Sequence, residues 1–191
     1  MEEKKEYKVL ARKYRPRMFK DLVGQNVLVQ ILSNAITNDR LAHAYVLTGV
    51  RGVGKTTTAR LISMSINCQK RQKDDCEPCG DCDSCKSTGI DSNLDVIEMD
   101  AASNTGVDDV RERIDNVKYK PVIGKYKIFL IDEVHMLSRS AFNALLKTLE
   151  EPPDHVKFIF ATTEIKKIPL TILSRVNRFD LRRLESVVLI N

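Results

Sequence analysis

The chain has 191 residues, with 31 Lys or Arg against 26 Asp or Glu, and its formal charge at pH 7 is +5. This length suits one domain with a sizeable core, and 42% hydrophobic residues among interspersed charges exclude a disordered tail. The longest aliphatic or aromatic runs are far shorter than the ~20 residues of a membrane span, and residues 1–6 lack the apolar segment of a signal peptide. We therefore expect a cytoplasmic protein without membrane contacts, whose five cysteines are thiols or metal ligands rather than disulfides.

The first half of the chain predicts a strand between two helices, followed by an insert. Residues 25–37 carry apolar side chains at helical spacing, namely Val27, Leu28, Ile31, Leu32, Ala35 and Ile36. Residues 43–48 predict a short buried strand, residues 49–55 a glycine-rich turn and residues 56–67 a helix. Residues 68–92 are rich in Cys, Asp, Gly, Ser and Pro and lack apolar periodicity, which indicates an insert.

The second half alternates strands and helices. Strands are predicted at 95–100, 127–132 and 156–161, with a fifth near 179–181. Helices are predicted at 107–117, from the N-cap Ser138 to about Glu150 with a buried stripe of Phe142, Leu145, Leu146 and Leu149, and near 169–174. Alternation of this kind predicts an α/β fold, with a parallel sheet between two layers of helices.

A phosphate-binding loop occupies the turn after the first strand. The segment Gly49-Val50-Arg51-Gly52-Val53-Gly54-Lys55-Thr56 matches GxxxxGK[ST], and it lies between a predicted strand and a predicted helix. Glycines let backbone N–H groups converge on phosphate oxygens, and the helix N-terminus adds partial positive charge. Lys55 would reach the β- and γ-phosphates of ATP, and the Thr56 hydroxyl would bind Mg²⁺.

Polar residues at later strand ends complete the predicted catalytic site. Asp132 could hold the Mg²⁺ shell, and Glu133 could polarise the attacking water, which together favour ATP hydrolysis over binding alone. For His135, a structural hydrogen bond is favoured over a link between nucleotide state and a neighbouring contact. Taken alone, Thr163 fits a strand residue and Arg175 a solvated surface charge.

The insert holds cysteines at metal-ligand spacing. Cys76, Cys79, Cys82 and Cys85 follow one another at CxxC spacing, and Cys68 lies upstream. A tetrahedral Cys₄ zinc site is the favoured interpretation, because metal binding would supply the folding energy that an insert with few apolar residues lacks. Spacing leaves open which four cysteines bind, although the consecutive set is sterically tight. An iron–sulfur cluster is less favoured, since the spacing lacks its x₃ step and trailing proline.

Several landmarks occur together in order: Ala11–Pro16, Val23-Gly24-Gln25, the phosphate-binding loop, the cysteine insert, Ile131–Leu137, Asn143–Pro153 and Ile172–Arg175. Over about residues 7–183 the chain resembles the AAA+ ATPase domains of the gamma/tau subunits of bacterial DNA polymerase III, the motor subunits of sliding-clamp loaders. The resemblance implies a P-loop NTPase sheet of five parallel strands, with a zinc-binding insert at 68–92. It also implies that a helical lid domain begins at 184–191.

The resemblance also implies individual roles. Tyr14, Arg15, Pro16 and Val23 would pack against adenine and sugar, and Thr57 would join the phosphate site. Thr163 would act as sensor 1. Arg175 would be an arginine finger reaching in trans into the next subunit, although Val176 replaces the cysteine of the family's Ser-Arg-Cys motif. The family's cysteine pattern selects Cys68, Cys79, Cys82 and Cys85 as zinc ligands and leaves Cys76 spare.

The implied function is ATP-driven loading of a ring-shaped clamp onto primed DNA, by a hetero-oligomeric complex that contacts the DNA backbone. The alternatives are a non-hydrolysing ATP-binding scaffold subunit and another AAA+ motor, such as a branch-migration motor. We expect residues 1–191 alone to be weakly active, because the lid is incomplete. The basic–aromatic stretch of Lys118, Tyr119, Lys120, Lys125, Tyr126 and Lys127 is interpreted as a solvated loop rather than a DNA-binding element.

Overall fold

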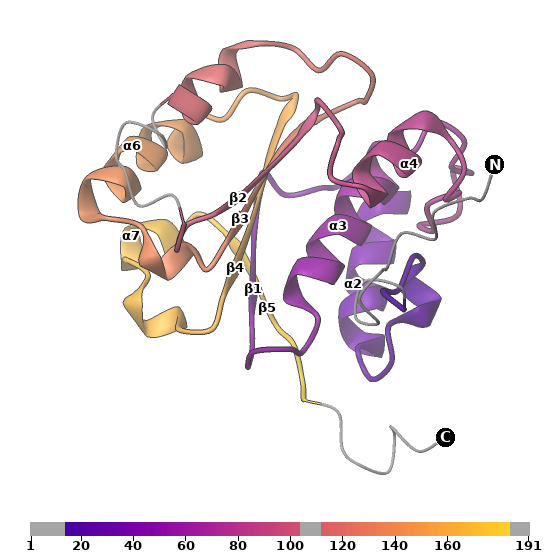
Figure 1. Ribbon diagram of the computed structural model, residues 1–191, viewed down its shortest axis with the longest axis horizontal. Helices are drawn as coiled ribbons and strands as arrows, with labels where there is room; N and C mark the ends of the chain where they lie inside the picture. The colour runs from indigo at the N-terminus through magenta and orange to yellow at the C-terminus, as the bar shows by residue number, and fades with distance from the viewer. Residues whose placement is uncertain (1–13, 104–111, 184–191) are drawn as a thin grey trace, which may run out of the picture.

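A five-stranded sheet forms the centre of the computed structural model, which describes residues 14–103 and 112–183 (Figure 1). The strands are β1 (Ala44–Thr48), β2 (Val96–Asp100), β3 (Lys127–Asp132), β4 (Val156–Thr162) and β5 (Asn177–Asp180). The α-helices are α2 (Asn26–Thr37), α3 (Lys55–Ile66), α4 (Asp83–Gly89), α6 (Arg139–Glu150) and α7 (Leu170–Leu173). Short 3₁₀ turns are η1 (Phe19–Asp21), η2 (Asn116–Lys118), η3 (Val134–Met136) and η4 (Ile165–Lys167).

The strand order is β2-β3-β4-β1-β5, and each neighbouring pair runs parallel, as predicted. The register aligns the last residues of the strands, since Thr48 pairs with Thr162 and Asp100 with Asp132. The carboxyl ends of β1, β2, β3 and β4 therefore lie along one edge. In open sheets of this kind, ligands bind outside that edge.

Two apolar layers hold helices against the two faces of the sheet. On one face, Phe129, Phe158 and Phe160 pack with buried residues of α6 and α7. On the other face, Tyr45, Leu47, Ile128, Leu130 and Ile159 pack with α2 and α3. Figure 1 shows α6 and α7 on one side of the sheet and α2, α3 and α4 on the other. Alternate residues of each strand thus supply opposite layers, as the period of two requires.

Some elements differ from the sequence-based predictions. The buried face of α2 consists of Leu28, Leu32 and Ile36, whereas Val27 and Ile31 are about half exposed or more. The insert contains the helix α4, which apolar periodicity did not reveal. Lys127 belongs to β3 and is buried, with its Nζ 5.5 Å from the Tyr119 ring centroid, so it is not part of a solvated loop. The predicted helix at 107–117 lies partly outside the described residues. Within its described part, residues 112–115 are helical.

Candidate nucleotide site and cysteine cluster

A cavity of about 440 Å³ lies beside the phosphate-binding loop, at the carboxyl ends of β2 and β3. It is lined by Arg15, Arg51, Gly52, Gly54, Lys55, Thr56, Thr57, Asp100, Asp132 and Glu133. Backbone amides, two basic side chains of the loop and three carboxylates therefore face one space. This combination suits a polyphosphate that is bound together with a divalent cation.

The loop conformation depends on its glycines. Gly52 and Gly54 have φ angles of 84° and 100°, which side chains with a Cβ rarely adopt. Gly54 precedes α3, and the first turn of this helix carries Lys55, Thr56 and Thr57. Lys55 Nζ donates to the carbonyls of Gly49 at 2.9 Å and Val50 at 3.2 Å. The ammonium group is thus held over the loop to which phosphates would bind.

Thr56 and Asp132 connect the loop to the end of β3. The Thr56 hydroxyl donates to Asp132 Oδ2 at 2.6 Å, although 76 positions separate the two residues. Both oxygens are hard ligands of the kind that Mg²⁺ prefers, and Asp100 and Glu133 line the same cavity. The residues present therefore fit a magnesium site, in which Thr56 and Asp132 would be the protein ligands.

Glu133 is fixed by its backbone and by the end of β4. Its φ and ψ angles of 45° and 44° are left-handed, which strains a residue other than glycine. Its Oε2 accepts hydrogen bonds from the Thr163 N–H at 3.2 Å and the Thr163 hydroxyl at 3.1 Å. Thr163 therefore holds the carboxylate that was predicted to polarise water.

His135 makes the hydrogen bond that the sequence favoured. Its Nδ1 lies 3.0 Å from the Thr162 hydroxyl and 3.4 Å from Glu133 Oε2, while its Nε2 lies 3.5 Å from Glu164 Oε1. A hydrogen bond from Lys167, reinforced by the Lys167 charge, lowers the pKa of Glu164 below its ordinary value. Glu164 therefore faces the imidazole as a carboxylate at neutral pH.

Of the four residues assigned to adenine and sugar, Arg15 and Pro16 line a cavity. Arg15 lines both the phosphate cavity and a second cavity of about 230 Å³, which Pro16 and Thr57 also line. Tyr14 and Val23 are 72% and 53% exposed and line neither cavity. Gln25 exchanges two hydrogen bonds with the backbone of Arg182, so the start of α2 lies beside the chain that follows β5.

Arg175 points toward α6 in its own chain. Its guanidinium donates to Glu150 Oε1 at 2.7 Å and to the Thr171 carbonyl at 2.6 Å. The side chain is 34% exposed and is not among the residues that line the phosphate cavity of its own chain. This position leaves the guanidinium partly accessible at the end of α7.

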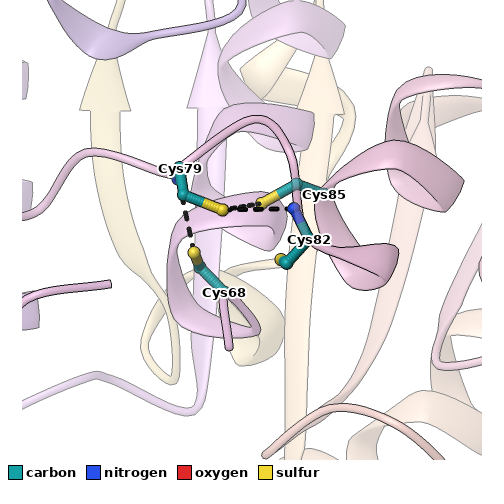
Figure 2. A group of neighbouring side chains, drawn as sticks. All are labelled: Cys68, Cys79, Cys82 and Cys85. Atoms are coloured by element: carbon teal, nitrogen blue, oxygen red, sulfur yellow. Dashed lines mark hydrogen bonds between the residues drawn. The ribbon is translucent and has the colours of Figure 1, made fainter. Parts of the chain in front are cut away.

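Four cysteine sulfurs lie together in the insert (Figure 2). The Sγ atoms of Cys68, Cys79, Cys82 and Cys85 all lie within 4.8 Å of one another. Zinc–sulfur bonds of about 2.3 Å in a tetrahedron place sulfurs about 3.8 Å apart, so the cluster needs only a small contraction to hold the ion. Three backbone N–H groups also point at sulfur. That of Cys79 donates to Cys68 Sγ at 3.3 Å, and those of Asp81 and Cys82 donate to Cys79 Sγ at 3.5 and 3.3 Å.

The electrostatics of the cluster favour one thiolate before any metal binds. Burial opposes ionisation of Cys79, but N–H groups of Asp81 and Cys82 donate to its sulfur and lower its pKa to about 6. Burial raises the pKa of Cys85 and Cys68. Cys76 is buried in the separate apolar layer formed with α2 and α3, and its carbonyl accepts from the Ser65 hydroxyl. It therefore lies apart from the four-sulfur cluster.

Comparison with known proteins identifies the family. A family model described as "DNA polymerase III, delta subunit" matches residues 24–185. The chain belongs to this family. A Haemophilus influenzae DNA polymerase III subunit tau/gamma is 54% identical over 94% of this chain and 26% of its own length. The Escherichia coli and Bacillus subtilis tau subunits are 52% and 50% identical, over 28% and 32% of their lengths. The chain thus spans about a quarter to a third of the length of these relatives.

Solved structures support the fold. A gamma-subunit-related protein of Thermotoga maritima matches 83% of this chain and 47% of its own, with a TM-score of 0.55 and 21% identity. The RuvB Holliday junction branch migration motor of the same organism matches 87% of this chain and 47% of its own, with a TM-score of 0.56 and 19% identity. The chain therefore shares the fold of these two proteins. Among its described residues, no helix is long and apolar enough to cross a bilayer.

Sequence reasoning overlooked several site residues. Asp100 lines the phosphate cavity because β2 ends beside β3, where it pairs with Asp132. Thr162 and Glu164 contact His135 at the end of β4. An acidic residue at the end of a predicted parallel strand was a usable signal for Asp100. The contacts of Thr162 and Glu164 depend on the turn after β3, which left no comparable signal.

Proposed function

We propose that this chain is the ATP-binding and ATP-hydrolysing domain of a clamp-loader motor subunit in a bacterial DNA polymerase III. The observation that carries the proposal is the hydrogen bond from Thr56 to Asp132, at a cavity beside the phosphate-binding loop that Glu133 also lines. It occurs in a chain whose relatives are DNA polymerase III gamma and tau subunits. A role in replication of bacterial DNA implies a cytoplasmic location.

Each residue of the site has a separate task in this proposal. The backbone N–H groups of the loop and Lys55 bind the phosphates of ATP, and Thr56 and Asp132 hold magnesium, whose charge stabilises the transferred phosphoryl group. Glu133 accepts a proton from the attacking water. Thr163 orients the Glu133 carboxylate through its two hydrogen bonds. Arg15 and Pro16 line the second cavity, in which the base and ribose would bind.

The proposed partners are other subunits of the loader, a sliding clamp and primer–template DNA. Arg175 would enter the ATP site of the neighbouring subunit, where its charge would stabilise the transition state and make hydrolysis depend on assembly. DNA would be contacted through its backbone, because a mildly basic chain supplies charge without a helix shaped to read bases. A helical lid beginning near residue 184 would close over the nucleotide.

Zinc is the proposed metal of the cysteine cluster. Four sulfurs with these separations, and N–H groups directed at two of them, suit a structural Cys₄ site that leaves no position for substrate. The ion would stabilise the insert, because α4 has seven residues and buries few apolar side chains.

Two alternatives remain for the function. A scaffold subunit would bind ATP without hydrolysing it, but Glu133 and its hydrogen-bonded partner Thr163 supply the groups that such a subunit does not need. Another AAA+ DNA motor is compatible with the fold, since the branch migration motor shares it. The identities of about 50% to DNA polymerase III subunits favour the clamp loader over that motor.

The deciding experiment is an ATP turnover assay with the full-length subunit, assembled with its partner subunits, in the presence of clamp and primed DNA. The clamp-loader motor predicts turnover that clamp and DNA together stimulate and that Glu133→Gln abolishes. Glu151→Gln is the matched control, because Glu151 is exposed at the end of α6. Tight ATP binding without turnover would identify the scaffold. Turnover that ignores the clamp but responds to branched DNA would identify the other motor.

A further inference from the structure

A group of close polar contacts joins Glu133 to the end of β4 through an imidazole. We propose that His135 is a positioning residue for the Glu133 carboxylate, which determines the carboxylate oxygen that faces the attacking water. This inference rests on the proposed ATP hydrolysis at the same site. It assigns His135 a role in the rate of the chemical step, in addition to the structural hydrogen bond to Thr162.

The contacts to Glu133 are concentrated on one oxygen. Both hydrogen bonds from Thr163 end on Oε2, and His135 Nδ1 lies 3.4 Å from that same atom. Within the described parts of the chain, these contacts leave Oε1 as the oxygen that can accept a proton from water. A carboxylate that could rotate freely would exchange its two oxygens, so three polar groups around Oε2 keep Oε1 facing the cavity.

The backbone explains how His135 reaches the carboxylate. The left-handed conformation of Glu133 reverses the chain directly after β3, and the Met136 N–H then donates to the Glu133 carbonyl at 2.8 Å. The turn η3 therefore begins beside the active carboxylate and brings His135 back over it. Strained backbone at a functional site persists only when its surroundings fix it, and the imidazole and Thr163 supply such contacts.

The imidazole itself is held firmly. Its side chain is 6% exposed, and its Nδ1 lies 3.0 Å from the hydroxyl of Thr162, a fully buried residue that pairs with Thr48. Thr48 immediately precedes the phosphate-binding loop. The Thr162 hydroxyl also accepts the Glu164 N–H at 3.0 Å, and Glu164 Oε1 lies 3.5 Å from Nε2. His135 is thus fixed relative to both β1 and β4, as a positioning residue must be.

The test uses the full-length subunit in its complex, with steady-state ATP hydrolysis and nucleotide affinity measured separately. We expect His135→Ala to lower kcat by at least about tenfold, with KM and nucleotide affinity within about twofold of the parent. His135→Asn, whose amide nitrogen can occupy the position of Nδ1, should recover most of the rate. His135→Gln, whose amide reaches toward the position of Nε2, should not.

Controls separate positioning from folding. Met136→Ala changes the same turn at a residue that is 46% exposed, and it should leave kcat unchanged. If His135→Ala does not fold, the comparison of His135→Asn with His135→Gln carries the test, at matched thermal midpoints. Parental kcat in His135→Ala, or equal losses in the Asn and Gln variants, would overturn the proposal.

The outcome also separates this inference from the proposed function. A parent without turnover, or a Glu133→Gln variant with parental turnover, would overturn both. A parent whose turnover is abolished by Glu133→Gln but unaffected by His135→Ala would overturn the role of His135 alone. A fall in kcat for His135→Ala that His135→Asn reverses supports it.

Discussion

The contacts of Lys55 predict that its substitution weakens nucleotide binding without destabilising the fold. Its Nζ bonds to two carbonyls of its own loop, so Lys55→Met removes a phosphate ligand without breaking a contact between elements. We expect nucleotide affinity to fall at least about 100-fold, because a buried charge beside the phosphates is lost. Fluorescent-nucleotide titration measures this, with the exposed Lys147→Met as control. An equal loss in both variants would contradict the assignment.

At the same scale, the sequence predicted the identity of the site residues better than their contacts. The phosphate-loop motif and the acids at the end of β3 were sufficient to expect Thr56 and Asp132 together, because parallel strands end at one edge. The contact of Thr163 with Glu133 was not expected. It depends on the left-handed backbone of Glu133, and a glutamate in that conformation leaves no signature in the sequence.

Among the elements, the cysteine insert gives a prediction about metal content. We expect Cys68→Ser to lose most of the bound zinc and Cys76→Ser to retain it, because Cys68 belongs to the four-sulfur cluster and Cys76 does not. Elemental analysis of the purified full-length variants measures zinc per chain, with anomalous scattering at the zinc edge as a second readout. Zinc lost in Cys76→Ser and kept in Cys68→Ser would reverse the assignment.

The connection between η2 and β3 gives a prediction about stability. Asp95 is 1% exposed, and its carboxylate accepts N–H groups of Val122, Ile123 and Gly124 at 2.6 to 2.7 Å. Asp95→Ala would leave these donors without their acceptor, so we expect unfolding to require about 3 kcal/mol less free energy.

Chemical denaturation of the purified protein measures the effect of Asp95→Ala. Asp115→Ala is the control, because the Asp115 side chain is 74% exposed and should change stability by less than about 0.5 kcal/mol. A loss below about 1 kcal/mol for Asp95→Ala would show that the carboxylate does not anchor this connection.

Most of the sheet and its helices could be predicted from the sequence, and the exceptions have physical reasons. Strands buried on both faces read as short apolar runs, and Ser138 caps α6 as expected, with its hydroxyl accepting from Ala141 N–H. The helix α4 was overlooked because hydrogen bonds and cysteines hold it in place of an apolar stripe. Its buried residues are Ser84, Cys85 and Thr88, and Asn93 donates to both Ser84 and Thr88.

For the whole assembly, the position of Arg175 predicts an effect that appears only between subunits. Arg175→Ala should lower ATP turnover of the complete complex at least about tenfold, because a charge near the transition state is lost. It should leave nucleotide binding by the subunit unchanged. Arg178→Ala is the control, since Arg178 pairs with Asp180 on β5. Equal turnover in the two variants would exclude a role for Arg175 in trans.

The position of β1 between β4 and β5 has a consequence for synthesis on the ribosome. Both neighbours of this strand come late in the chain, since Ala44 pairs with Phe158 and Tyr45 with Asn177. At ~5–20 residues per second, on the order of ten seconds pass between the emergence of the phosphate-binding loop and that of β5. During this interval the edges of β1 are unpaired and its apolar side chains uncovered. The nascent chain is therefore most prone to aggregation in the interval after the phosphate-binding loop has been synthesised and before β5 has emerged.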